Sequence, residues 1–203
     1  MVKFLDDFSS PPHIHNISYR GVVIEGNVHN DDPNATAMWM PSGSYWTQPK
    51  GEVHITAAKG KENLAFIEID QGPYLVLPMQ KAFDSGERPL NMDRSNIMWF
   101  NASNDTNNQS KIAYLWGSME EGKLNGTLLK LPSNFKGSIM PSGSLFQGVV
   151  ISGEIDYKLN ADANKALEAG SLFSSKVEHN ISTTKETLLY IRSDGKFETL
   201  LSK

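Results

Sequence analysis

The histidines are the residues of this sequence with the clearest capacity for chemistry. His13 and His15 flank Ile14. In an extended segment alternate side chains share a side, so both imidazoles face one way and Ile14 faces the other. His54 follows in a second segment with strand character. Three neutral imidazoles that meet at one point could bind one divalent metal ion (Zn, Fe, Mn or Ni) and leave positions open for a substrate.

The spacing of these histidines resembles the two motifs of the cupin superfamily, H-x-H-x(3,4)-E-x6-G and G-x5-P-x-G-x2-H-x3-N. The positions that keep this spacing are His13, His15, Tyr19, Gly26, Gly43, Pro49, Gly51 and His54. The resemblance implies that His13, His15 and His54 are metal ligands inside a double-stranded β-helix barrel.

Two positions depart from the cupin motifs. Tyr19 stands where the first motif has Glu (Arg20 under the looser spacing), and Ala58 stands where the second has Asn. A site of three histidines without a carboxylate keeps a charge of about +2 and should favour an anionic or enolate-like ligand. We expect Tyr19 to lie beside the metal. By strand parity, Glu52 or Glu25 could supply a carboxylate as ligand or base, so Tyr19 and Glu52 are the candidate catalytic residues.

The surrounding sequence predicts an all-β chain. Short segments rich in Val, Ile, Tyr, Phe and Trp alternate with turn residues, a spacing typical of sandwiches and barrels. A brief helical pattern occurs at Ala161–Ala169. The expected strands are Tyr19–Val28, Ser44–Gln48, Val53–Ala58, Leu64–Asp70, Tyr74–Leu77, Gly148–Tyr157 and Thr187–Arg192.

The chain also repeats itself, which predicts two tandem cupin jelly-roll barrels. The segment Gly21–Gly26 returns as Gly148–Gly153, 127 residues later. We expect an N-terminal barrel at 1–80 that carries the metal motif, a linker at 81–110 and a C-terminal barrel at 111–203. The second copy has Met140, Ser142 and Phe146 where the first has His13, His15 and Tyr19, and keeps only His179 near the position of His54. Its metal site should therefore be lost.

The two copies differ at their leading edges. The second copy has two expected strands, Ile112–Trp116 and Gly126–Leu131, whose counterparts are largely missing before Phe8. An unpaired sheet edge tends to recruit another strand. We expect linker residues such as Asn96–Phe100, or a second subunit in a homodimer, to cover this edge.

Composition narrows the classes of function. The chain has 203 residues and no cysteine, which excludes disulfides and thiol chemistry. Its net charge is −4, without a run of Lys or Arg, so nucleic acid is not an expected partner. No apolar stretch approaches the length that spans a bilayer, and the acidic N-terminus does not resemble a signal peptide. We expect a cytoplasmic protein, or a periplasmic one if a leader has been removed.

Two functions from different classes remain open. The first is a metal-dependent enzyme, dioxygenase-like or isomerase- or lyase-like, acting on a small oxygenated substrate. The second is a non-enzymatic ligand sensor, because the chain also resembles bicupins related to the cupin domain of the ChrR-like anti-sigma factors. A storage role is a weaker third alternative, since storage does not require three convergent histidines.

Overall fold

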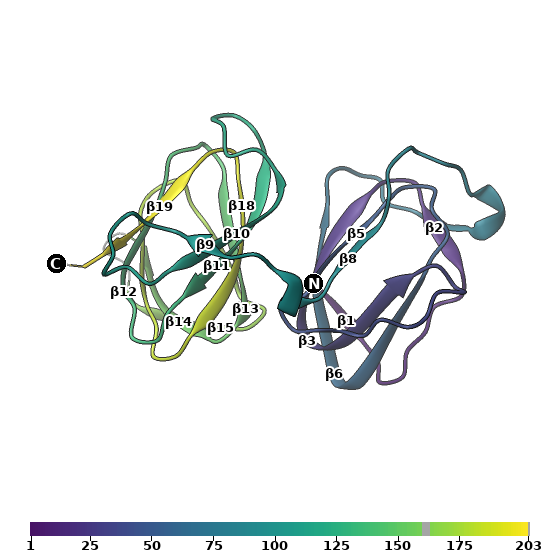
Figure 1. Ribbon diagram of the computed structural model, residues 1–203, viewed down its shortest axis with the longest axis horizontal. Helices are drawn as coiled ribbons and strands as arrows, with labels where there is room; N and C mark the ends of the chain where they lie inside the picture. Colours follow the sequence, from purple (N-terminus) through teal and green to yellow (C-terminus); the bar gives the residue numbers. More distant parts are fainter. Residues whose placement is uncertain (160–162, 203) are drawn as a thin grey trace. The chain divides into compact units, whose positions relative to one another are not determined.

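The computed structural model describes residues 1–159 and 163–202, and the chain divides into two compact units, Met1–Ile97 and Met98–Lys203. Each unit is built from antiparallel strands that curve around an interior (Figure 1). Regular helix in the described ranges is limited to two single turns of 3₁₀ helix, η1 (Met79–Lys81) and η2 (Arg94–Asn96). The all-β prediction is therefore confirmed.

The first unit is organised around two long antiparallel strands, β3 (Tyr19–Asp31) and β6 (Ile55–Ile69), which pair from end to end with bulges between. Its main sheet runs in the order β1-β6-β3-β5-β8, with β4 beside β3, and a smaller sheet joins β2 to β7. The strands of this unit are β1 (Val2–Phe4), β2 (His13–His15), β3 (Tyr19–Asp31), β4 (Met40–Pro41), β5 (Tyr45–Gln48), β6 (Ile55–Ile69), β7 (Val76–Pro78) and β8 (Leu90–Met92).

The second unit is a two-sheet barrel. One sheet runs β16-β13-β18-β11-β10-β9 and the other β15-β14-β17-β12-β19. The strands are β9 (Phe100–Asn101), β10 (Lys111–Gly117), β11 (Asn125–Leu131), β12 (Lys136–Pro141), β13 (Phe146–Ser152), β14 (Glu154–Leu159), β15 (Lys165–Glu168), β16 (Leu172–Ser174), β17 (His179–Ser182), β18 (Thr187–Ser193) and β19 (Phe197–Leu201).

The sequence repeat corresponds to a structural one. Gly26 and Gly153, 127 residues apart, have φ values of +75° and +86°, which favour glycine. In the first unit β3 continues past Gly26 with bulges on either side of Glu25. In the second unit the same stretch breaks at Gly153 into β13 and β14.

Several expectations about individual segments need correction. The stretch 81–110 gives a strand to each unit rather than only connecting them, because β8 pairs with β5 and β9 pairs with β10. Phe100 thus covers an edge of the second unit, whereas the leading edge of the first is formed by β1 on β6. The helix expected at Ala161–Ala169 is wrong where it is described: Lys165–Glu168 is strand β15, paired with β14. Residues 161 and 162 lie outside the described ranges.

The interiors of the two units differ in how fully they are packed. The second unit holds a continuous apolar cluster that includes Phe146, Phe173 and Phe197. The corresponding cluster of the first unit is smaller and centres on Trp46 and Tyr19. Space therefore remains inside the first unit, next to the residues of the metal motif.

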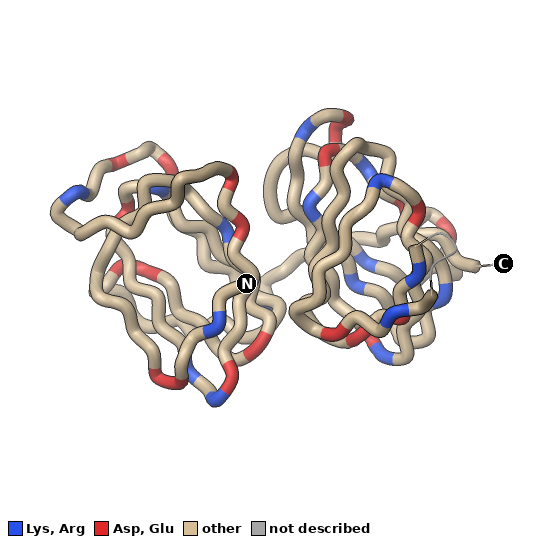
Figure 2. The backbone as a smooth tube through the Cα atoms, turned by 180° about the vertical axis from the view of Figure 1, so that it is seen from behind, with Lys and Arg blue, Asp and Glu red and all other residues tan. Residues whose placement is uncertain are grey.

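Charged residues follow no single-sign pattern along either unit. Figure 2 shows Lys and Arg positions interspersed with Asp and Glu along the backbone. Within the described ranges, no helix is both long enough and apolar enough to cross a membrane.

Candidate metal centre

The backbone brings the two motifs together. His13 and His54 form an isolated antiparallel bridge, in which each residue's N–H donates to the other's carbonyl over 3.1 Å and 3.0 Å. On its other edge β2 pairs with β7, which aligns His15 with Val76. The alternation predicted for β2 is confirmed, since His13 and His15 line the same cavity whereas Ile14 does not. The three imidazoles therefore come from two neighbouring chain segments.

A glycine turn sets the position of His54. Gly51 has a φ of +78°, and its N–H donates to the carbonyl of His15 over 2.8 Å. A Cβ at this position would lie 2.4 Å from the carbonyl oxygen of Phe83, so only glycine fits. The turn therefore ties the second motif to β2 and explains why the motif requires glycine three residues before the histidine.

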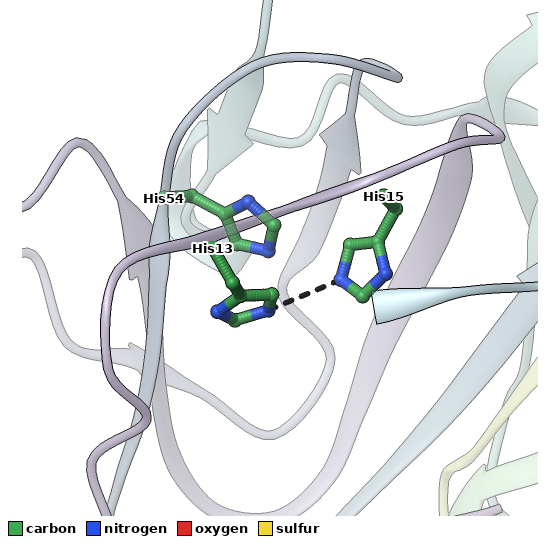
Figure 3. Close-up of side chains that lie close together, drawn as sticks. All are labelled: His13, His15 and His54. Atoms are coloured by element: carbon green, nitrogen blue, oxygen red, sulfur yellow. Dashed lines mark hydrogen bonds between the residues drawn. The ribbon is translucent and has the colours of Figure 1, made fainter. Parts of the chain in front are cut away.

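The imidazole rings of His13, His15 and His54 converge on one point (Figure 3). The Nε2 atoms of His13 and His15 are 3.2 Å apart, and the potential ligand atoms of all three residues lie within 4.8 Å of one another. Two nitrogen ligands with metal bonds of about 2.0–2.1 Å are separated by roughly 3 Å. The arrangement thus has the dimensions of a three-histidine metal centre.

Hydrogen bonds at the far side of each ring determine which nitrogen carries the proton. Nδ1 of His13 donates to the carbonyl of Pro11 over 2.8 Å, Nδ1 of His15 to that of Leu75 over 3.3 Å, and Nδ1 of His54 to that of Glu52 over 3.2 Å. A carbonyl can only accept, so each Nδ1 is protonated and each Nε2 keeps a lone pair, which can accept a hydrogen bond or bind a metal ion. Lone pairs that face one another repel unless a cation lies between them. The donor set therefore fits a divalent ion.

Burial keeps two of the ligands neutral. Loss of solvation lowers the pKa of His15 to about 4 and that of His54 to about 3, and charge repulsion from His13 adds to both shifts. A metal ligand must be unprotonated. Both rings are consequently ready to bind a cation at neutral pH.

Tyr19 lies at the site, as expected, and belongs to a buried polar network. Its hydroxyl donates to Oδ1 of Asn30 over 2.9 Å and lies 3.4 Å from Nε2 of His54. Thr56 donates to the same oxygen of Asn30, and the amide of Asn30 donates to Gln48. Burial raises the pKa of Tyr19 to about 12, so its hydroxyl remains a neutral donor.

A second tyrosine contacts the centre. The hydroxyl of Tyr74 lies 3.1 Å from Nε2 of His15, and the two rings stack with their centroids 4.5 Å apart. Burial raises the pKa of this hydroxyl as well. In the sequence, Tyr74 is marked only as the first residue of the expected strand Tyr74–Leu77. Tyr74 belongs to neither cupin motif, so no motif marked it as a residue of the site.

The histidines open onto a cavity of about 610 Å³ in the first unit. Its walls are mostly apolar and come from the N-terminal segment, from β2, β3, β5, β6 and β7, and from the chain before β7. The lining residues are Met1, Val2, Phe4, Phe8, Ser10, Pro11, His13, His15, Tyr19, Trp46, Thr56, Ile67, Ile69, Tyr74 and Val76. This volume lies within the usual range of small-molecule sites, about 300–1,000 Å³.

The carboxylates considered from sequence do not reach this cavity. Glu52 contributes its backbone carbonyl to His54, but its side chain lines a separate hollow with Asp84 and Arg88. The parity argument failed because residues 50–51 form a turn and residues 52–53 lie outside any strand. Glu25 is exposed, since the bulges of β3 change the alternation before the site is reached.

Arg20 also lies away from the cavity lining. It pairs with Asp70 through two hydrogen bonds of 2.8 Å and 3.0 Å, and lies 3.4 Å from Glu68. Successive residues of a strand face opposite sides, so Arg20 and Tyr19 diverge.

The second unit keeps the histidine but not the site. His179 and His54 occupy equivalent positions in the two units. His29 and Asp156 are related by the 127-residue repeat, and each histidine lies three residues before the strand partner of one of them: His54 for His29 and His179 for Asp156. Both ring nitrogens of His179 are engaged. Nδ1 accepts from the hydroxyl of Tyr157 over 2.8 Å, and Nε2 donates to the carbonyl of Ser175 over 3.0 Å. This histidine therefore serves the packing of its barrel.

Comparison with solved structures shows a two-barrel cupin fold. The chain superposes with a TM-score of 0.72 on a Nostoc punctiforme protein suggested to be a dioxygenase, at 13% identity over 99% of this chain and 72% of the other. It matches a salicylate 1,2-dioxygenase from Pseudaminobacter salicylatoxidans with a TM-score of 0.58, at 14% identity over 97% of this chain and 73% of the other.

A third match is an oxalate decarboxylase variant from Bacillus subtilis, with a TM-score of 0.58 and 10% identity over 98% of this chain and 69% of the other. No curated protein matches the sequence. The family model for a domain of unknown function, DUF4437, matches residues 1–200, and the chain therefore belongs to the DUF4437 family.

Proposed function

We propose that the first unit binds one divalent metal ion through His13, His15 and His54 and is a metal-dependent enzyme that acts on a small oxygenated anion. The observation that carries this proposal is the tautomer of the three rings. Each Nδ1 is bound to a backbone carbonyl, so three lone pairs face one another on Nε2. This arrangement is costly without a cation and well suited to one.

The ion would supply Lewis acidity. With positions left free for a chelating substrate, a bound Zn, Mn, Ni or Fe ion would polarise substrate oxygens, and Fe would in addition support reaction with O2. Dioxygenase-like chemistry is the first choice because two of the proteins with this fold carry that designation. If the bound ion is Zn, Mn or Ni, we expect an isomerase- or lyase-like reaction instead.

The protein's own residues would orient the substrate and exclude water. Tyr19 and Tyr74 are neutral at physiological pH. The Tyr19 hydroxyl already donates its proton to Asn30, so the Tyr74 hydroxyl would be the one to donate a hydrogen bond to an oxygen held beside the histidines. None of the described residues that line the cavity is Asp or Glu. We infer that the substrate binds as an anion that has already lost its proton, since Tyr19 and Tyr74 are poor bases.

Turnover measurements test this proposal. Protein loaded separately with Fe, Mn, Ni or Zn is mixed with β-diketones and aromatic diols, and both oxygen consumption and substrate loss are followed. We expect turnover with at least one ion and one class. It should disappear after chelation and in His15→Ala, and it should persist in His29→Ala, whose ring is buried but lies outside the cluster. Metal-bound protein that turns over nothing would contradict the enzymatic reading.

A non-enzymatic ligand sensor of the ChrR-like type is the second candidate. It is favoured by the lack of carboxylates among the described lining residues, because binding does not require a base whereas many reactions do. It predicts tight, metal-dependent binding of a small anion without conversion. A protein partner that dissociates when the metal is removed would support it over the enzyme.

A further inference from the structure

The wall of the cavity in the first unit separates sharply into a polar and an apolar part. The apolar part includes Phe4, Phe8, Ile67, Ile69 and Val76. None of the described lining residues is Asp, Glu, Lys or Arg. The metal-motif histidines therefore lie at one side of a space whose other described side chains carry no charge.

The hydroxyl and imidazole groups of the lining are gathered at the histidines. Tyr74 lies 3.1 Å from His15, and Tyr19 lies 3.4 Å from His54. Ser10 approaches Nδ1 of His13 at 3.3 Å. The remaining hydroxyl, that of Thr56, donates to Asn30, the acceptor of Tyr19. Hydrogen bonding to a ligand is thus concentrated around the metal ligands.

Cations near this part of the fold are committed to other partners. Arg20 pairs with Asp70, and Lys3 pairs with Glu62 at the exposed edge of β1. A second anionic group held at the apolar wall, away from the metal ion, would therefore lose its water without gaining a charged side chain as its partner, which is strongly unfavourable.

We infer that the ligand of this site is a molecule with one bidentate anionic oxygen headgroup and an uncharged apolar body at least as large as a phenyl ring. The headgroup lies between the histidines and the hydroxyls of Tyr19 and Tyr74, and the body lies against the apolar wall. This inference rests on the proposed metal centre. It excludes ligands that carry a carboxylate at the far end of the body, away from the metal ion.

Hydroxamates test this ligand class without turnover, because they present one constant bidentate oxygen headgroup on a variable body. Binding of acetohydroxamate, benzohydroxamate and 4-carboxybenzohydroxamate to zinc-loaded protein is measured by calorimetry, with zinc content checked after dialysis. We expect benzohydroxamate to bind at least about tenfold more tightly than acetohydroxamate, because its ring buries additional apolar surface. The added carboxylate should reduce affinity at least about tenfold.

A matched pair of variants locates the apolar body. Phe8 lines the cavity, whereas Leu5, in the same segment, is 80% exposed and does not. Phe8→Ser should weaken benzohydroxamate about three- to tenfold while changing acetohydroxamate little. Leu5→Ser should change neither affinity.

The outcomes separate this inference from the proposed function. Zinc-loaded protein that binds all three hydroxamates equally overturns the ligand class and leaves the metal centre intact. Protein that cannot be loaded with zinc overturns the proposed function itself. The comparison of ligands on the unmodified chain stands even if Phe8→Ser fails to fold.

Discussion

The hydroxyl of Tyr19 donates a hydrogen bond to Oδ1 of Asn30 over 2.9 Å, although the two residues lie at opposite ends of β3. Asn30 in turn accepts from Thr56 on β6 and donates to Gln48 on β5. The network thus joins three strands behind His54. It holds Tyr19 as a neutral donor beside the metal ligands.

Removing the Tyr19 hydroxyl should cost stability without removing the metal. Tyr19→Phe breaks a buried hydrogen bond, so we expect the free energy of unfolding to fall by about 1–2 kcal/mol in urea titrations. Metal content should be unchanged, because three histidines remain.

Tyr45→Phe is the matched control for Tyr19→Phe. The hydroxyl of Tyr45 is buried and has no hydrogen-bond partner among the described residues. Its loss should therefore be neutral or slightly stabilising. Equal effects of the two variants would argue against a structural role for the Tyr19 network.

The metal-free protein should become less stable as the pH falls below about 6.5. The pKa values of His15 and His54 lie at about 4 and about 3 in the folded state, below the ordinary value of 6.5. Between the folded-state and the ordinary pKa values of these histidines, the unfolded chain binds more protons than the folded chain. The free energy of unfolding therefore decreases as the pH falls through this range. Urea midpoints of chelator-treated protein from pH 7.5 to 4.5 measure this slope.

Two variants test the assignment of this slope. Replacing His15 and His54 together by glutamine should reduce the slope, while His179, whose pKa burial also lowers, should keep part of it. His29→Gln leaves both groups in place and should preserve it. A midpoint that is independent of pH in the unmodified protein would contradict the burial of these rings.

The bulge at Gly26 in β3 should tolerate no side chain. At its φ of +75°, a Cβ would lie 2.2 Å from Oδ1 of Asn63 and 2.4 Å from the carbonyl of Glu62. We expect Gly26→Ala to destabilise the first unit by about 2–4 kcal/mol, through backbone strain and the clash. Gly86 also has a positive φ, but a Cβ there would meet nothing within 4 Å, so Gly86→Ala should cost only about 1 kcal/mol. Urea titration measures the free energy of unfolding of both variants.

The meeting of His13, His15 and His54 could be predicted because it depends on local rules. Alternation fixes the common side of His13 and His15, and the spacing of Gly51 and His54 encodes a turn. The strands and the repeat followed from the same kind of signal. The sequence motif therefore contained the histidine cluster.

Other parts of the site depend on features that a sequence pattern does not encode. The bulges in β3 exclude Glu25 and bring Asn30 inward, and the turn before β6 turns Glu52 away. Tyr74 reaches His15 only through the pairing of β2 with β7. The positions of these side chains depend on how each segment pairs with its neighbours. The alternation of side chains within a single strand cannot determine that pairing.

Metal content by elemental analysis tests the central claim most directly. Protein is purified without added metal or chelator, beside His54→Ala and the control His29→Ala, a buried histidine outside the cluster. The account predicts about one Zn, Fe, Mn or Ni per chain in the unmodified protein and in His29→Ala, and none in His54→Ala. Close to two ions per chain would mean that the second unit also binds metal. Absence of metal from the unmodified protein, even after reconstitution, would contradict the account.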